Sequence, residues 1–293
     1  MMLPESVPVG GAARLLRSLL KLILVVLAGG FAASALVRYS PGFDIDDNAW
    51  NPKVSAETLA AMHARREHDN SLPRFYLRYV SAAVHGNLGN SDLLNAPVSE
   101  LLAQRLPVTA KLVGYGTGGG LLLGAAFAWL AVWPRRAAFG LLAGSVSGLL
   151  LAIPPAVLAL AFFFAEAPLA LAVALTVMPR VFGTMRALFA ELLLSPALLA
   201  ARARGVPPIV LGVRYVLRAA APQLFALCGV ALVLAFGSII PIEALCDVPG
   251  IGQLALLAAK GRDLPLLSGL ALLITFVVAS VETVGDLAGG VRG

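Results

Sequence analysis

Side chains that could catalyse a reaction or bind a metal are present in the sequence, but their spacing forms no recognisable site. His63, His68 and His85 are separated by five and 17 residues, so no two of them share a helical face at i and i+4. Asp46 and Asp47 lack the glycine and the ligand spacing of an EF-hand loop. No serine has the surroundings of a nucleophile. We therefore expect no catalytic residue, no metal site and no cofactor.

A glycine-rich stretch, Gly114-Tyr-Gly-Thr-Gly-Gly119, has the spacing of a dinucleotide fingerprint. It opens an apolar run and follows no predicted strand, so nucleotide binding is not expected there. The small residues Gly116, Gly120 and Gly124 lie four apart, a spacing that predicts close helix packing in lipid. Because GxxxxGK[ST] is absent from the sequence, we expect no ATPase site in this chain.

The segment 200–208 specifies a projecting helical turn. Arg202 and Arg204 would complement the dipole of a helix that ends there. Gly205 can adopt the left-handed conformation after the helix, and proline at 207 and 208 first ends that helix and then begins another. As an alternative, the two arginines would only orient the chain in a membrane. The residues of the segment are Ala200, Ala201, Arg202, Ala203, Arg204, Gly205, Val206, Pro207 and Pro208.

The composition places these residues in a membrane protein. Hydrophobic residues make up 59% of the 293 residues, charged residues only 13%, and mean hydropathy is +0.87. Apolar runs reach the roughly 20 residues that a helix needs to cross a bilayer. We predict an all-α fold with six transmembrane helices, at 15–37, 108–133, 138–163, 168–190, 219–242 and 265–285. The first run could also be a cleaved signal peptide.

Basic residues predict the orientation of the spans. Twelve Lys and Arg fall on one side and two, Lys260 and Arg262, in the short loop on the other, so we expect cytoplasmic N- and C-termini. The same pattern accounts for the net charge of +6 without nucleic-acid binding. Pro179, Arg180 and Arg186 interrupt the fourth span, and we expect both arginines to lie toward the headgroups.

Three regions follow from this topology. Residues 1–38 hold the cytoplasmic N-terminus and the first span, 39–107 form an extracytoplasmic segment, and 108–293 form a five-helix core. Within the extracytoplasmic segment, Ser55 to His68 has the pattern of an amphipathic helix.

The segment 200–205 resembles the EAA loop of binding-protein-dependent ABC permeases of the dipeptide, oligopeptide and nickel class, in its Ala-Arg-Ala-Lys-Gly form. Arg186 and Glu191 match the arginine and acid that precede this loop in the family. Leu199 and Tyr215 depart from it, because the family often has an acid and a histidine there. Matches on the predicted outer side are Pro41, Gly42, Gly86, Gly89, Pro107, Glu243, Pro249, Gly250, Gly252, Arg262, Asp263 and Pro265.

This resemblance implies a type I ABC importer permease of the inner membrane, with a cytoplasmic coupling helix in a loop at about 187–218. The implied partners are a second homologous permease, two ABC ATPase subunits, an extracytoplasmic solute-binding protein and membrane lipid. The chain would carry peptides or a related small solute without being an enzyme itself. A secondary transporter or channel that needs no ATPase is the alternative, and a receptor-like assembly protein is a third possibility.

Overall fold

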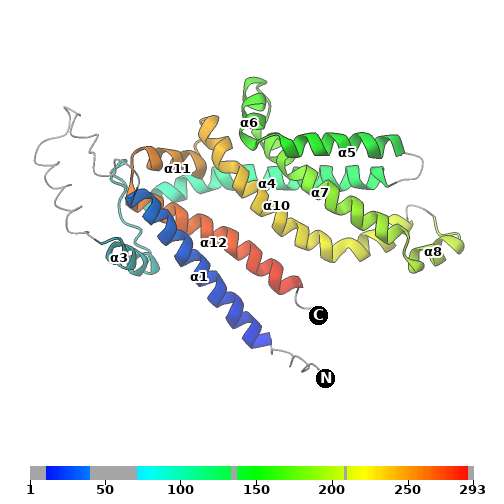
Figure 1. The fold of residues 1–293 in the computed structure, drawn as a ribbon, viewed down its shortest axis with the longest axis horizontal. Coiled ribbons are helices and arrows are strands. Elements are labelled where there is room, and N and C mark those ends of the chain that lie inside the picture. Colours follow the sequence, from blue (N-terminus) through cyan, green and yellow to red (C-terminus); the bar gives the residue numbers. More distant parts are fainter. Residues whose placement is uncertain (1–10, 40–70, 133–136, 208–209, 290–293) are drawn as a thin grey trace, which may run out of the picture. The chain divides into compact units, whose positions relative to one another are not determined.

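A computed structural model describes residues 11–39, 71–132, 137–207 and 210–289 of the chain (Figure 1). Every named element in these ranges is a helix, and the backbone pairs as an extended bridge only between Asn90 and Pro97. The predicted all-α membrane fold is therefore confirmed. The predicted helix from Ser55 to His68 and the residues Pro41, Gly42 and Pro208 lie outside the described residues.

Five of the helices are long and apolar enough to cross a membrane. A helix also pairs its backbone N–H and C=O groups with one another, which is required of a segment that crosses hydrocarbon. These helices are α1 (Gly11–Arg38), α4 (Val98–Ala131), α7 (Leu169–Leu193), α10 (Arg218–Leu245) and α12 (Leu264–Gly289).

The third predicted span is not one straight helix. The structure divides it into α5 (Ala137–Ala152) and α6 (Pro155–Phe164), bent by 100°, and only the pair together could count as a sixth span. Two consecutive prolines explain the break, because Pro154 and Pro155 each lack the N–H that would continue the helical ladder of α5. Hydropathy alone could not reveal the bend, since the apolar run continues through it.

Two other predicted boundaries also change. Helix α4 begins at Val98 and continues through Pro107, so the second span starts ten residues earlier than predicted. Polar residues lower the mean hydropathy of this first part of α4, so a hydropathy criterion does not include it in the span. Helix α7 continues through Pro179 and Arg180, so the fourth predicted span, which seemed to be interrupted at these residues, is continuous.

The chain forms two compact units, which are described separately. The first unit comprises Met1–Leu106 and Leu254–Ala279, and the second Pro107–Gln253 and Ser280–Gly293. In the first unit, the short helix α3 (Leu72–Val84) packs on α1, where the Tyr76 hydroxyl donates a hydrogen bond to the Leu27 carbonyl at 2.6 Å. Ser34 of α1 and Ser268 of α12 share a hydrogen bond of 2.8 Å between their hydroxyls.

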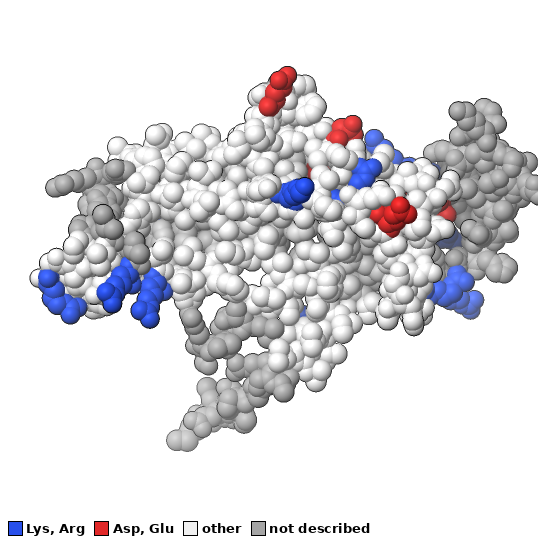
Figure 2. All heavy atoms as spheres, turned by 180° about the vertical axis from the view of Figure 1, so that it is seen from behind, with Lys and Arg blue, Asp and Glu red and all other residues white. Residues whose placement is uncertain are grey.

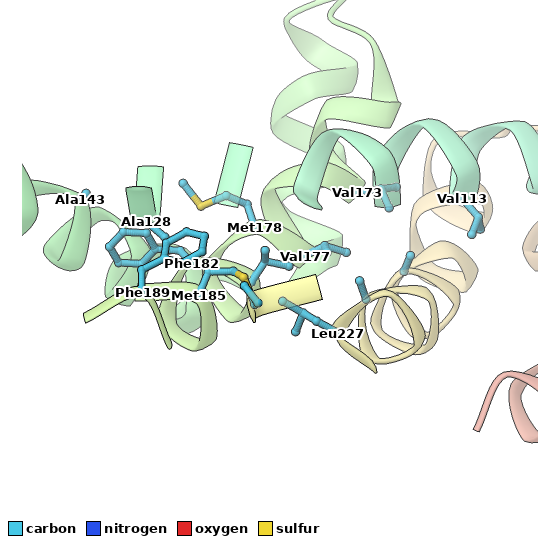
Figure 3. Packing of buried hydrophobic residues seen from close by; sticks show 14 of the residues in the cluster. Val113, Ala128, Ala143, Val173, Val177, Met178, Phe182, Met185, Phe189 and Leu227 are labelled. Atoms are coloured by element: carbon cyan, nitrogen blue, oxygen red, sulfur yellow. The ribbon is translucent and has the colours of Figure 1, made fainter. Parts of the chain in front are cut away.

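In the second unit, α4 and α7 pack at unusually short range. A Cβ atom built on Gly120 would lie 2.7 Å from the Val177 Cβ, and the same relation links Gly116 to Val173 and Gly124 to Val181. Glycine therefore allows the two backbones to approach, which confirms the close packing predicted from the four-residue spacing. Figure 3 shows the adjoining core, in which Met178, Phe182, Met185, Phe189 and Leu227 fill the space between α7 and its neighbours.

Candidate functional site

The segment that the sequence singled out forms a short helix with a closed end. Helix α8 (Pro196–Ala203) follows α7 after a two-residue turn, and Pro196 occupies its first position, where no N–H is needed. At the other end, Gly205 has φ +77°, its N–H bonds the Arg202 carbonyl at 2.9 Å, and the Val206 N–H bonds the Ala201 carbonyl at 3.3 Å. This is a Schellman cap, so the predicted left-handed Gly205 is confirmed.

One side of α8 is anchored and the other is exposed. Leu198 and Ala201 are buried against the rest of the second unit. Val206 is partly buried, and the other described residues of the predicted coupling segment are exposed: Ala200, Arg202, Ala203, Arg204, Gly205 and Pro207. Helix α8 is thus held through Leu198 and Ala201 and carries two exposed arginines at its C-terminal end.

Basic side chains gather at this end of the second unit, as Figure 2 shows. Arg202 on α8, Arg204 at its C-cap, and Arg214 and Arg218 just beyond it are all exposed. Glu191, near the end of α7, is exposed as well. Arg186 lies instead against the unit, with its guanidinium 5.9 Å from the centre of the Phe182 ring. The structure thus leaves Arg186 outside the exposed surface of α8.

A π-helix, η3 (Leu211–Leu217), joins the α8 segment to α10. A Cβ atom on Gly212 would lie 2.8 Å from the ring of Trp129 on α4, and that ring packs edge-to-face on Phe189 of α7 at 5.6 Å. Glycine at 212 is therefore required for the loosely wound turn to seat on the indole. The sequence analysis missed this contact, and a lone Gly opposite an apolar run gave no signal for it.

The far end of α10 carries a second set of predicted residues. Glu243 is completely buried, and its two carboxyl oxygens accept hydrogen bonds from the Thr109 hydroxyl at 2.7 Å and the Gly252 N–H at 2.6 Å. Thr109 in turn accepts from the Ile251 N–H at 2.9 Å. A Cβ on Gly250 would lie only 2.2 Å from the Glu243 carboxyl group, so the loop containing Pro249 can close over Glu243 only with glycine at this position.

In the first unit, Asp263 plays a comparable part. Its oxygens accept from the Ser91 hydroxyl at 2.5 Å, from the Leu93 N–H at 3.0 Å and from the Leu266 N–H at 2.9 Å. Asp263 therefore caps the start of α12 and also fixes the loop before α4. That loop contains Gly86 and Gly89, both with positive φ.

Two further predicted residues frame this loop in the first unit. Arg262, directly before Asp263, also has positive φ. The Pro265 carbonyl accepts from the Tyr79 hydroxyl at 3.0 Å, and burial, with a smaller effect from the charge of Asp263, raises the pKa of Tyr79 above its ordinary value. The phenol therefore stays protonated and remains a donor.

The structure brings the predicted residues together as three separate groups. The α8 turn lies before the start of α10, the Glu243 group lies near its end, and the Asp263 group belongs to the first unit. Pro107 lies inside α4 and is exposed. Within the described ranges, no three His, Cys, Asp or Glu side chains gather as metal ligands.

Comparison with known proteins connects these groups to a family. The family model described as binding-protein-dependent transport system inner membrane component matches residues 120–291. A putative peptide permease protein of Brucella ovis is 30% identical over 86% of this chain and 89% of its own length. A probable peptide ABC transporter permease protein of Sinorhizobium fredii is 25% identical over 94% and 96%. A nickel import system permease protein of Staphylococcus aureus is 24% identical over 93% and 88%.

The match favours the importer over a secondary transporter or channel, since all three relatives are permeases and two are named as parts of ABC or import systems. The matched range begins within α4, continues to α12, and includes the α8 turn and the residues Glu243, Gly250 and Gly252. With its membrane-spanning helices, the chain belongs to the family of binding-protein-dependent transport system inner membrane components, the multi-pass permease subunits of ATP-driven ABC importers.

Proposed function

We propose that α8 and its Gly205 turn form the site through which an ABC ATPase subunit drives this permease. The complex would contain two permeases and two ATPase subunits, with one ATPase docked on each permease. The observation that carries the proposal is the capped, exposed and basic α8, held on the second unit by Leu198 and Ala201. A short capped helix that is anchored by buried side chains can transmit force from a neighbouring protein. It supplies no chemistry of its own, in keeping with a transport subunit.

The connection from α8 to the rest of the unit supports a mechanical role. Helix α8 packs on η3, and η3 leads directly into α10. With 28 residues, α10 is about 42 Å long, so it reaches from one side of a bilayer to the other. A displacement of α8 would therefore be carried to the loop that closes over Glu243. Coupling of this kind requires two global states with different contacts at α8.

The proposed orientation places α8 in the cytosol and the Glu243 and Asp263 groups outside. Exposed arginines on and around α8 support this orientation, because basic residues are enriched on cytoplasmic flanks. On the outer side, we propose that the loop with Pro249 and Gly250 helps to receive an extracytoplasmic solute-binding protein. A second homologous permease would complete the pathway across the membrane.

The proposed cargo is a peptide or a related small solute. Support comes from the relatives, which are named as peptide permeases and a nickel import permease. The separate solute-binding protein would carry most of the specificity.

Substitutions at Gly205 test the proposal. Valine at φ +77° costs about 1–2 kcal/mol and opens the cap, whereas asparagine tolerates a left-handed conformation. Apart from the two adjoining residues, no atom of the described residues lies within 4 Å of the position where either side chain would begin, so neither substitution clashes with them. We expect Gly205→Val to abolish ATP-dependent uptake by the assembled complex and Gly205→Asn to retain most of it, with equal amounts of both variants in the membrane.

Equal uptake by the two variants would refute a coupling role for the α8 turn. The orientation is checked on the same segment with Ala203→Cys, in a chain whose native cysteines are replaced. This exposed position should react with a membrane-impermeant thiol reagent in inside-out vesicles and stay unlabelled in intact cells. Labelling of intact cells would reverse the proposed orientation.

A further inference from the structure

The exposed side of α7 has an unexpected composition for a membrane-spanning helix. Between its first turn and Ala190, every exposed residue is either small or polar. The set consists of Arg180, Gly183, Thr184, Ala187 and Ala190. These positions recur at three- and four-residue intervals, so they form one continuous stripe along the C-terminal half of the helix.

Two other spans expose the opposite kind of surface. On α5, Leu141 is 72% exposed and Leu149 67%, and on α1 Leu24 is 68% exposed. Large aliphatic side chains are what lipid tails contact, so α5 and α1 present ordinary lipid-facing surfaces. Because the stripe on α7 has no large apolar side chain, it is unsuited to lipid and suited to water or to another polar surface.

Arg180 lies at the N-terminal end of this stripe and near the middle of α7. It is eleven residues from the first residue of α7 and 13 from the last, or about 16 and 20 Å along the axis. The packing of α5 on α7 gives a second estimate of the position of Arg180 along the helix axis. The Ser147 hydroxyl of α5 lies 3.4 Å from the Pro179 carbonyl, and Ser147 is five residues before the end of α5. Both helices place Arg180 away from the ends of the span.

A guanidinium at this depth needs a polar surrounding. Helical side chains lean toward the N-terminus of their helix, and Arg180 would still stop about 10 Å short of that end after extending. An arginine at the centre of a span costs several kcal/mol in hydrocarbon, so residues of this kind face a water-filled cavity or another chain. Gly183 and Thr184 beside it add no bulk that would cover it, and among the described residues no atom outside the adjoining turn of α7 lies within 4 Å of a Cβ built on Gly183.

We infer that the α7 stripe lines the water-filled translocation pathway, and that Arg180 is a mid-membrane subsite attracting anionic groups of the solute, carboxylates above all. A guanidinium binds carboxylates through paired hydrogen bonds, and such a subsite would retain a passing acidic group without trapping it. This inference rests on the importer function proposed above, since a pathway between two permeases is required for α7 to face water.

Charged thiol reagents test the subsite without knowledge of the solute. Thr184→Cys is placed in a chain carrying Cys228→Ala and Cys246→Ala, assembled with its partner subunits in lipid nanodiscs. Negatively charged methanethiosulfonate ethylsulfonate and its positively charged trimethylammonium counterpart are compared by their reaction rates. Residues four apart on a helix lie about 5–6 Å apart. At that distance one charge changes the ratio of the two rates by about tenfold or more.

We expect the cysteine at 184 to react with both reagents and to favour the anionic one. Arg180→Gln should lower the anionic-to-cationic rate ratio about tenfold, whereas Arg180→Lys should preserve it. Leu149→Cys on α5 is the matched control and should not react, because it faces lipid. Ala187→Cys gives a second position on the stripe if the cysteine at 184 impairs assembly.

Three results would overturn the inference. The first is that the stripe cysteines react as little as Leu149→Cys. The second is that the anionic-to-cationic rate ratio is unchanged in Arg180→Gln. The third is that Thr184→Cys cross-links to the partner permease and reacts with neither reagent. The labelling requires no uptake and no working α8 turn. Failure here with a normal response to the Gly205 substitutions therefore removes the subsite alone, while failure of the Gly205 test removes the coupling proposal.

Discussion

The buried carboxyl group of Glu243 allows a quantitative test of how the loop after α10 is held. Glu243→Ala removes the acceptors of the Thr109 hydroxyl and the Gly252 N–H, which lie 2.7 and 2.6 Å from the carboxyl oxygens. The site is fully buried, so both donors stay unsatisfied at about 1–3 kcal/mol each. The free energy of unfolding should fall by roughly 2–6 kcal/mol, and by about half as much in Glu243→Gln, which keeps one acceptor.

Unfolding of the purified protein in mixed micelles, titrated with a denaturing detergent, measures this free energy. Glu282→Ala removes an exposed carboxyl group and should change stability by less than about 0.5 kcal/mol. A double-mutant cycle with Thr109→Val separates the hydrogen bond from the volume change. Residues in one buried network should show a coupling energy of about 0.5–3 kcal/mol.

Two outcomes would contradict this reasoning. If Glu243→Ala and Glu282→Ala unfold at the same detergent concentration, the buried carboxyl group contributes nothing to the fold. If the losses in Glu243→Ala and Thr109→Val simply add, the two side chains act independently and the observed hydrogen bond has no energetic meaning.

Two further substitutions probe the other close contacts. Asp263→Asn should destabilise the first unit by about 1–2 kcal/mol, since the amide keeps only one acceptor oxygen, and limited proteolysis should then cut the loop at 86–97 faster than in the wild type. Gly120→Ala should lower the thermal midpoint, because the new methyl would lie 2.7 Å from the Val177 Cβ. Gly118→Ala, with open space around it, should leave the midpoint unchanged or raise it slightly, and equal effects would contradict the packing argument.

Features that depend on neighbours along the chain were predictable from the sequence. The left-handed Gly205 followed from a run of helix formers, a glycine and a proline in order, and the structure has the cap that this order predicts. The close approach at Gly116, Gly120 and Gly124 followed from the four-residue period of the small side chains. In both cases one helix and its periodicity contain all the information that is needed.

Features that depend on a second segment were not predictable in the same way. Glu243 and Asp263 were each noted as outer-side residues, but their partners Thr109 and Ser91 are 134 and 172 residues away in sequence. Arg180 was expected near the headgroups because proline and arginine suggested the end of a span. Helix α7 packs on α10 and lies close to α4, and it continues through Pro179 despite the missing hydrogen bond, so Arg180 falls in its middle.

The long sequence separation of the Ser91–Asp263 pair also matters while the protein is being made. At about 5–20 residues per second, the ribosome needs roughly 10–30 s after Ser91 before it supplies Asp263. Until then the loop at 86–97 has no acceptor for its Ser91 hydroxyl or its Leu93 amide. We therefore expect nascent chains that stop before Asp263 to be cleaved at this loop faster than chains in which α12 has entered the bilayer.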